Sequence, residues 1–239
     1  MQLHIFENAD QASLACATVF AAQIMKKPDS VLGLATGSTP VKTYENLVAW
    51  HKQGALDFSE CISYNLDEYV GIDYNHEQSY HRFMKDHLFD HVNIKESHVP
   101  DGNNQNPKAE CKRYDKAIKN AGGLDILFLG IGRNGHIGFN EPADHFVLGT
   151  HIVDLTPSTI EANRRFFDSA DQVPRQAMSL GIGAIMDAKT VVLVAFGEEK
   201  AQAIHDAVKG AVTPMVQASI LQMHKNVIFF VDKAAASKL

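Results

Sequence analysis

Residues 125–142 read DILFLGIGRNGHIGFNEP, in which an apolar run of strand length passes directly into glycines, a histidine, and amide and acidic side chains. The run at 125–129 predicts a buried strand, because it is short, continuous and apolar. The glycines of residues 130–135 match the G-x-G-x-x-G spacing of a dinucleotide site, but that fingerprint opens a helix. Residues 137–142 contain a glycine and a proline and predict a loop instead, so we reject the dinucleotide interpretation.

Similar apolar runs recur along the chain and alternate with stretches of helical periodicity. Strands are predicted at 30–35, 61–66, 190–196 and 226–231, and helices at 41–54, after residue 78, at 107–121 and at 198–209. Continuous apolar strands separated by helices indicate a parallel sheet that is covered on both faces. No internal repeat or Pro/Gly/Ser-rich linker divides the chain. We therefore predict an α/β fold in a single domain, 1–239. It has three layers, α/β/α, in which a mostly parallel, Rossmann-like sheet lies between two layers of helices.

Composition and charge exclude several classes of protein. The chain has 239 residues, of which 45% are hydrophobic and 21% charged, as in ordinary globular proteins. A formal net charge of −6 argues against a nucleic-acid-binding face. Three widely spaced cysteines argue against a disulfide framework and for a reducing compartment. No signal-peptide pattern and no apolar run of roughly 20 residues is present. We expect a cytoplasmic protein with no nucleic-acid partner, no membrane partner and no metal site.

Ligands of such sheets bind at the carboxyl ends of the strands, and three predicted strand ends carry unusual polar sequences. The first is TGSTP at residues 36–40, where Gly37, Ser38 and Thr39 follow a strand and precede a helix. Free N–H groups and the helix dipole at such a position favour an anion, typically phosphate. An alternative is a helix cap in which Thr39 bonds its own backbone. The two interpretations are compatible.

The second strand end carries Asp67 and Glu68. Consecutive side chains of an extended segment point to opposite faces, so one carboxylate can face the ligand crevice and the other the scaffold. Partial burial near Glu68 would raise the pKa of Asp67 and make it a better general base. The alternative interpretation is an acidic turn with no function.

The third strand end carries His136, with Asn134 two residues before it and Glu141 five residues after it. An unperturbed histidine pKa near 6.5 suits proton transfer, and both neighbours are close enough to orient the ring or tune its charge. A histidine in such a place is otherwise structural or lies on the surface.

Cations for an anionic ligand are predicted at Arg164–Arg165 and at Lys200. One of the two arginines can face a site while the other faces solvent. Lys200 lies in the first turn of a predicted helix, where a cation is electrostatically misplaced unless an anion lies nearby. Each of these residues could equally be a solvated charge.

Taken together, the segments LGLATGSTP, NLDEYVGI, LGIGRNGHIGFNEP and ANRRFF resemble glucosamine-6-phosphate deaminases, in the order that this family has them. The wider fold group includes 6-phosphogluconolactonase, ribose-5-phosphate isomerase and the CoA-transferase-like proteins. Phosphogluconolactonases are similar in the TGSTP-like loop and the Gly-His pair but continue differently after each motif. The resemblance implies conversion of glucosamine 6-phosphate to fructose 6-phosphate and ammonia, in the catabolism of N-acetylglucosamine, with no metal or organic cofactor.

By matching motif positions, the resemblance implies a role for each candidate residue. Asp67 would move a proton between C2 and C1, and His136, oriented by Glu141, would open the sugar ring. The phosphate would be bound by Gly37, Ser38, Thr39, Arg165 and Lys200. Some members of the family carry an acid where this chain has Asn134, so the ring-opening step is expected to depend more on Glu141.

Three alternatives stay open on the sequence alone. They are a lactonase similar to 6-phosphogluconolactonase, a galactosamine-6-phosphate deaminase, and a sugar-phosphate-binding regulator without catalysis. The basic residues that follow the FNEP loop in larger allosteric relatives are absent here. The resemblance therefore implies a monomer or a small homo-oligomer.

Overall fold

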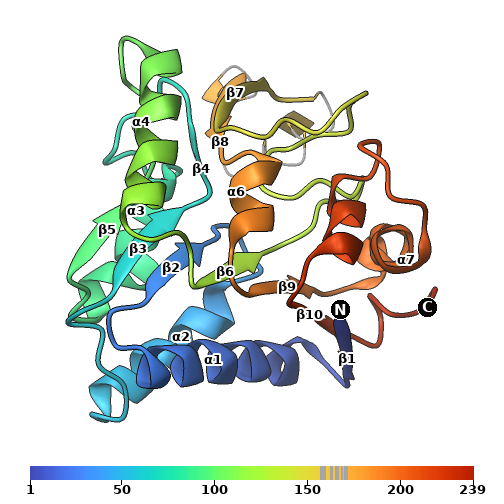
Figure 1. Ribbon diagram of the computed structural model, residues 1–239, viewed down its shortest axis with the longest axis horizontal. Coiled ribbons are helices and arrows are strands. Elements are labelled where there is room, and N and C mark those ends of the chain that lie inside the picture. Colours follow the sequence, from blue (N-terminus) through green and yellow to red (C-terminus); the bar gives the residue numbers. More distant parts are fainter. Residues whose placement is uncertain (157–159, 162–163, 165–166, 168, 170–171) are drawn as a thin grey trace.

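The computed structural model describes residues 1–239 apart from 157–159, 162–163, 165–166, 168 and 170–171. Its centre is a seven-stranded parallel sheet with the strand order β1-β10-β9-β6-β2-β3-β5 (Figure 1). The strands are β1 (Gln2–Phe6), β2 (Val31–Leu34), β3 (Ile62–Asn65), β5 (Glu96–His98), β6 (Ile126–Leu129), β9 (Val191–Ala195) and β10 (Val227–Asp232). The predicted α/β fold with a mostly parallel sheet is confirmed, and all five predicted strands lie in this sheet.

Helices cover both faces of the sheet. On one side are α1 (Ala9–Lys26) and α2 (Val41–Lys52), and on the other are α4 (Pro107–Asn120), α6 (Ile182–Asp187) and α7 (Ala201–Lys209) (Figure 1). The remaining helical segments are α3 (Tyr80–His87), η1 (Phe89–His91), η3 (Glu198–Lys200) and η4 (Gln217–Met223). The helix predicted at 198–209 begins as the 3₁₀ turn η3 and continues as α7. No helix in the described part of the chain is long and apolar enough to cross a membrane.

The central strands are buried on both faces because helices pack on each side of them. Every residue of β2, β6 and β9 is buried, which explains why these strands read as unbroken apolar runs. The edge strands β1 and β5 contain exposed residues and show no such run.

A second, antiparallel sheet stands above the carboxyl ends of the main one. It has the order β4-β8-β7 and consists of β4 (Asp67–Tyr69), β8 (Gln176–Ser179) and β7 (His151–Asp154). Leu66 joins the two sheets, because its N–H donates to Leu34 O at 3.1 Å and its carbonyl accepts from Leu180 N at 2.7 Å. These short strands were not predicted from the sequence.

The opposite, amino-terminal edge of the main sheet is held by Asp125. Its carboxylate accepts hydrogen bonds from Lys27 Nζ and Lys189 Nζ, both at 2.6 Å, and from Val31 N at 2.8 Å. Burial disfavours the charge of Asp125, but these three donors outweigh burial and hold the pKa of the carboxyl below its ordinary value. Asp125 thereby ties together the segments that lead into β2, β6 and β9.

Candidate active site

The structure brings the three predicted strand ends together at the carboxyl edge of the sheet, where β2 lies between β3 and β6. A Cβ placed on Gly130 would lie 3.9 Å from Thr39 Oγ1, so the first and third strand ends touch. A Cβ placed on Gly138 would lie 3.6 Å from Asp67 Oδ2, so the second and third do as well. The predicted convergence of these segments is therefore a feature of the fold.

The loop after β2 leads into α2 without capping its first turn. Gly37 has a φ of +87°, a conformation that favours glycine and turns the chain toward the helix. Pro40 is the residue just before α2, and α2 has neither a side-chain cap nor an acidic residue in its first turn. The alternative of a Thr39 cap is thus not what the structure has. Ser38 is exposed and Thr39 half-buried beside this uncapped end, an arrangement that suits an anion.

Asp67 opens β4 and is only 7% exposed. Burial, together with the nearby charge of Glu68, raises the pKa of Asp67 to about 8. No hydrogen-bond donor reaches its carboxylate within the part of the chain that the structure describes. The result is a carboxyl group that takes up and releases a proton near neutral pH, as a general base must.

Glu68 points the other way, as the alternation of an extended strand requires. Its carboxylate accepts hydrogen bonds from the N–H groups of Tyr69, Tyr80 and His81, at 2.9, 3.0 and 2.9 Å. Two of these donors belong to the first turn of α3, so Glu68 binds β4 to that helix. Burial outweighs the three hydrogen bonds and raises the pKa of Glu68 to about 6. Glu68 is the scaffold-facing member of the pair.

His136 lies in a loop and pairs with Glu141. Its Nδ1 is 3.3 Å from Glu141 Oε2, which also accepts from Asn134 Nδ2 at 2.7 Å. The ring packs on Gly132, where an added Cβ would lie 2.4 Å from the imidazole. With Nδ1 facing the carboxylate, Nε2 has no hydrogen bond to any of the described residues and is available for a ligand. Residues 130–142 contain turns and no helix, which confirms that they are not a dinucleotide fingerprint.

Two polar residues that support this loop were not predicted from the sequence. Asn140 is buried, and its Nδ2 donates to Ile137 O and Leu180 O, both at 2.8 Å. Ser179, at the end of β8, accepts the N–H of Phe139 at 3.0 Å. Asn140 is part of the FNEP segment that carries the family resemblance, so that motif could have indicated it. No local sequence pattern indicates Ser179.

The predicted cations are only partly placed. Lys200 ends η3 at the start of α7 and is half-buried. It follows β9, which lies beside β6 in the sheet. Arg165 lies outside the described residues. Its neighbour Arg164 is exposed and lies 3.9 Å from Glu161 Oε2.

These features define an α/β protein with a candidate site on the rim, the carboxyl edge, of its parallel sheet. The site combines the loop of residues 36–40, which we call the anion loop, with the Asp67 carboxyl and the His136–Glu141 pair. Residues 6–229 match the family of glucosamine-6-phosphate isomerases and 6-phosphogluconolactonases, and the chain belongs to this family. It is 51% identical to a glucosamine-6-phosphate deaminase of Clostridioides difficile (strain 630), over 100% of this chain and 97% of that protein. It is 50% identical to a protein of the same name from Shewanella woodyi, over 100% and 91% of the two chains.

Solved structures show the same relationship. A monomeric glucosamine-6-phosphate deaminase superposes with a TM-score of 0.97 at 40% identity, over 100% of both chains. The 6-phosphogluconolactonase of Trypanosoma brucei superposes with a TM-score of 0.75 at 17% identity, which shows a shared fold alone.

Proposed function

We propose that this protein converts glucosamine 6-phosphate and water to fructose 6-phosphate and ammonia, a reaction of amino-sugar catabolism. The observation that carries the proposal is the placement of the buried Asp67 carboxyl beside Gly138, which lies two residues after His136 and three before its partner Glu141. One group can then act on C2 of a sugar while the other acts on the ring oxygen. The two deaminases that share about half of their residues with this chain support the choice of substrate.

The phosphate is bound at the uncapped start of α2. We assign the backbone at Gly37, the hydroxyls of Ser38 and Thr39, and the side chains of Arg165 and Lys200 to this phosphate. The exposure of Ser38 and the partial exposure of Thr39 support the assignment. The helix N–H groups attract the anion although the whole chain carries a net charge of −6. Binding there places the sugar over the rim.

Ring opening is assigned to His136. Its Nε2 passes a proton to the ring oxygen O5, the C1 hydroxyl gives its proton to water, and the C1–O5 bond breaks to give the open-chain aldehyde. Nε2 then regains a proton from that water. Glu141 on Nδ1 stabilises the charged ring during this transfer. Asn134 holds Glu141 in place through a hydrogen bond of 2.7 Å and supplies no charge of its own.

Isomerisation is assigned to Asp67. Its carboxylate takes the proton from C2 while the C1 aldehyde oxygen takes a proton from water, which gives an enolamine across C1 and C2. Asp67 then delivers the proton that it took from C2 to C1. The resulting imine at C2 is hydrolysed by water, which releases ammonia and leaves the ketone of fructose 6-phosphate. A carboxyl whose pKa is raised to about 8 by burial is a stronger base than an ordinary aspartate.

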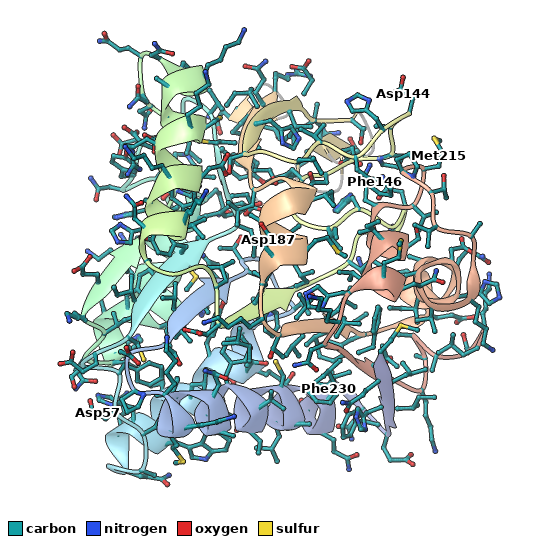
Figure 2. All side chains as sticks on the ribbon, viewed as in Figure 1. Asp57, Asp144, Phe146, Asp187, Met215 and Phe230 are labelled. Atoms are coloured by element: carbon teal, nitrogen blue, oxygen red, sulfur yellow. The ribbon has the colours of Figure 1, made fainter. Side chains whose placement is uncertain are left out.

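The experiment measures ammonia and fructose 6-phosphate after incubation with glucosamine 6-phosphate. The wild type is expected to form both in equal amounts, and Asp67→Asn to form neither while still binding the amino-alditol phosphate that lacks the C1 aldehyde. Asp187→Asn is the matched control, because Asp187 (labelled in Figure 2) is exposed at the end of α6, two residues before Lys189, whose Nζ bonds Asp125 at the amino-terminal edge of the sheet. Binding without turnover by the wild type would refute the proposal in favour of a regulator.

Parallel reactions test the other sugar phosphates. Faster turnover of 6-phosphogluconolactone would identify a lactonase, and faster turnover of galactosamine 6-phosphate would identify the epimeric deaminase. Either result would overturn the proposed substrate while leaving the site residues in place.

We further propose that the chain is a single domain that acts in the cytoplasm as a monomer or a small homo-oligomer. The solved relative with a TM-score of 0.97 is described as monomeric, which supports this. Light scattering on the purified protein measures the assembly directly.

A further inference from the structure

Ser179 is fully buried and lies directly across from Asp67 in the small sheet. The β4–β8 pairing places Asp67 opposite Ser179, and the exposed fraction of Ser179 is 0%. This serine belongs neither to the anion loop nor to the residues assigned to proton transfer. A hydroxyl in such a place requires partners, since an unsatisfied buried polar group is costly.

This hydroxyl accepts one hydrogen bond and donates another. Ser179 Oγ accepts the N–H of Phe139 at 3.0 Å and donates to Leu180 O at 3.3 Å. Phe139 lies between His136 and Glu141 in the chain, in the loop that holds the histidine pair. The residue after Ser179 makes a second tie to the same loop, because Leu180 O accepts from Asn140 Nδ2 at 2.8 Å. We call Ser179 and Leu180 the clasp.

The clasp also holds the segment that carries the base. Leu180 N donates to Leu66 O at 2.7 Å, one residue before Asp67. The clasp therefore connects the Asp67 strand on one side and the His136 loop on the other.

The loop around Gly138 packs closely against both Ser179 and Asp67. Gly138 has a φ of +58°, and a Cβ placed there would lie 2.9 Å from Ser179 Oγ and 3.6 Å from Asp67 Oδ2. The loop backbone thus rests against both residues. A shift of the loop relative to β8 changes the separation between Asp67 and His136.

We propose that Ser179 is a positioning residue whose hydroxyl, by accepting the Phe139 N–H, sets the spacing between Asp67 and the His136–Glu141 pair. The inference rests on the proposed deaminase reaction. The two groups must act on neighbouring parts of one bound sugar, and a misplacement of about 1 Å is enough to cost on the order of a hundredfold in rate. Among the described residues, no hydrogen bond joins the anion loop to Ser179 or Leu180. Loss of the Ser179 hydroxyl is therefore expected to leave substrate affinity unchanged.

The test compares Ser179→Ala with Ser179→Thr, which keeps the hydroxyl, and with Ser63→Ala as a matched control. Ser63 is equally buried, in β3, and its hydroxyl has no hydrogen-bond partner among the described residues. We measure kcat and KM for ammonia release, and calorimetric binding of 2-amino-2-deoxyglucitol 6-phosphate, which lacks the reacting aldehyde. Binding stoichiometry counts folded sites and separates a misplaced site from a lost one.

Ser179→Ala is expected to lower kcat about tenfold to a hundredfold, with KM and binding stoichiometry unchanged, and Ser179→Thr and Ser63→Ala to stay within threefold of the wild type. The deuterium isotope effect for substrate labelled at C2 is expected to rise in Ser179→Ala, since proton abstraction becomes slower. A kcat within twofold of the wild type, or a stoichiometry that falls in proportion to kcat, overturns the inference. If Ser179→Ala does not fold, Ser179→Cys, with its weaker acceptor, is judged by the same criteria. If the wild type itself releases no ammonia from glucosamine 6-phosphate, that result instead refutes the proposed function.

Discussion

Replacing Asp67 by asparagine should stabilise the fold in a pH-dependent way while it removes activity. Burial and the charge of Glu68 raise the pKa of Asp67 from 3.8 to about 8. Between these two values the folded protein holds a proton that the unfolded chain releases, so the wild-type free energy of unfolding falls as pH rises. At 1.36 kcal/mol per pKa unit, the loss reaches about 4 kcal/mol at pH 7. Asparagine has nearly the same shape and does not titrate, so the variant escapes this loss.

The assay is urea unfolding of the wild type and Asp67→Asn at pH 4, 6 and 8. Groups common to both proteins cancel in the difference, which should grow with pH by a few kcal/mol. A change of this size corresponds to roughly 10 °C in melting temperature for a chain of this length. Asp187→Asn, which alters an exposed carboxylate, should show no such growth. A difference between Asp67→Asn and the wild type that stays constant from pH 4 to pH 8 would refute the reasoning.

Three further variants test other parts of the structure. Gly132→Ala should displace the His136 ring and lower kcat on the order of a hundredfold with little change in melting temperature, because the added Cβ would lie 2.4 Å from that ring; an unchanged kcat contradicts this. Asn134→Asp should move the pH profile of kcat to higher pH, since a second carboxylate near Glu141 favours the charged form of the His136 ring. An unchanged profile counts against the assignment of ring opening to His136. Asp125→Ala should cost about 1–3 kcal/mol in urea unfolding at pH 7, mainly because the buried N–H of Val31 loses its acceptor; the two lysines stay 37% and 59% exposed to water and lose little. The free energies of unfolding of wild type and variant should converge as acid protonates Asp125, whose pKa is lowered, and a difference that does not depend on pH contradicts this.

The main sheet could be predicted because its central strands are buried on both faces. Helices on each side require apolar residues at every position of β2, β6 and β9, and the sequence shows this as unbroken runs. The edge strand β5 reads Glu-Ser-His and the rim strand β4 reads Asp-Glu-Tyr. Neither has an apolar run or a full period of alternation, so only tertiary pairing reveals them.

In the candidate site, too, contacts between residues close in the sequence could be predicted, and contacts between distant residues could not. Asn134, His136 and Glu141 lie within eight residues, and their pairing follows from a short loop. The opposite orientations of Asp67 and Glu68 follow from the strand period. The contact between Ser179 and the Phe139 N–H spans 40 residues and depends on how β8 pairs with β4. No pattern near Ser179 in the sequence could have indicated it.

Each edge of the sheet has a buried aspartate, and the surroundings of the two shift their pKa values in opposite directions. At the amino-terminal edge, Asp125 is 3% exposed and receives two lysines and a backbone N–H, so its charge is compensated and its pKa falls. At the carboxyl edge, Asp67 is 7% exposed, has Glu68 beside it, and its pKa rises. A fold selected only for stability would give both carboxyls the first environment. An uncompensated carboxyl is costly where it is buried, but its raised pKa makes it basic enough to take a proton from carbon. The role proposed for Asp67 therefore accounts for this cost. If that role is right, a cation placed near Asp67 should raise the free energy of unfolding and lower kcat together.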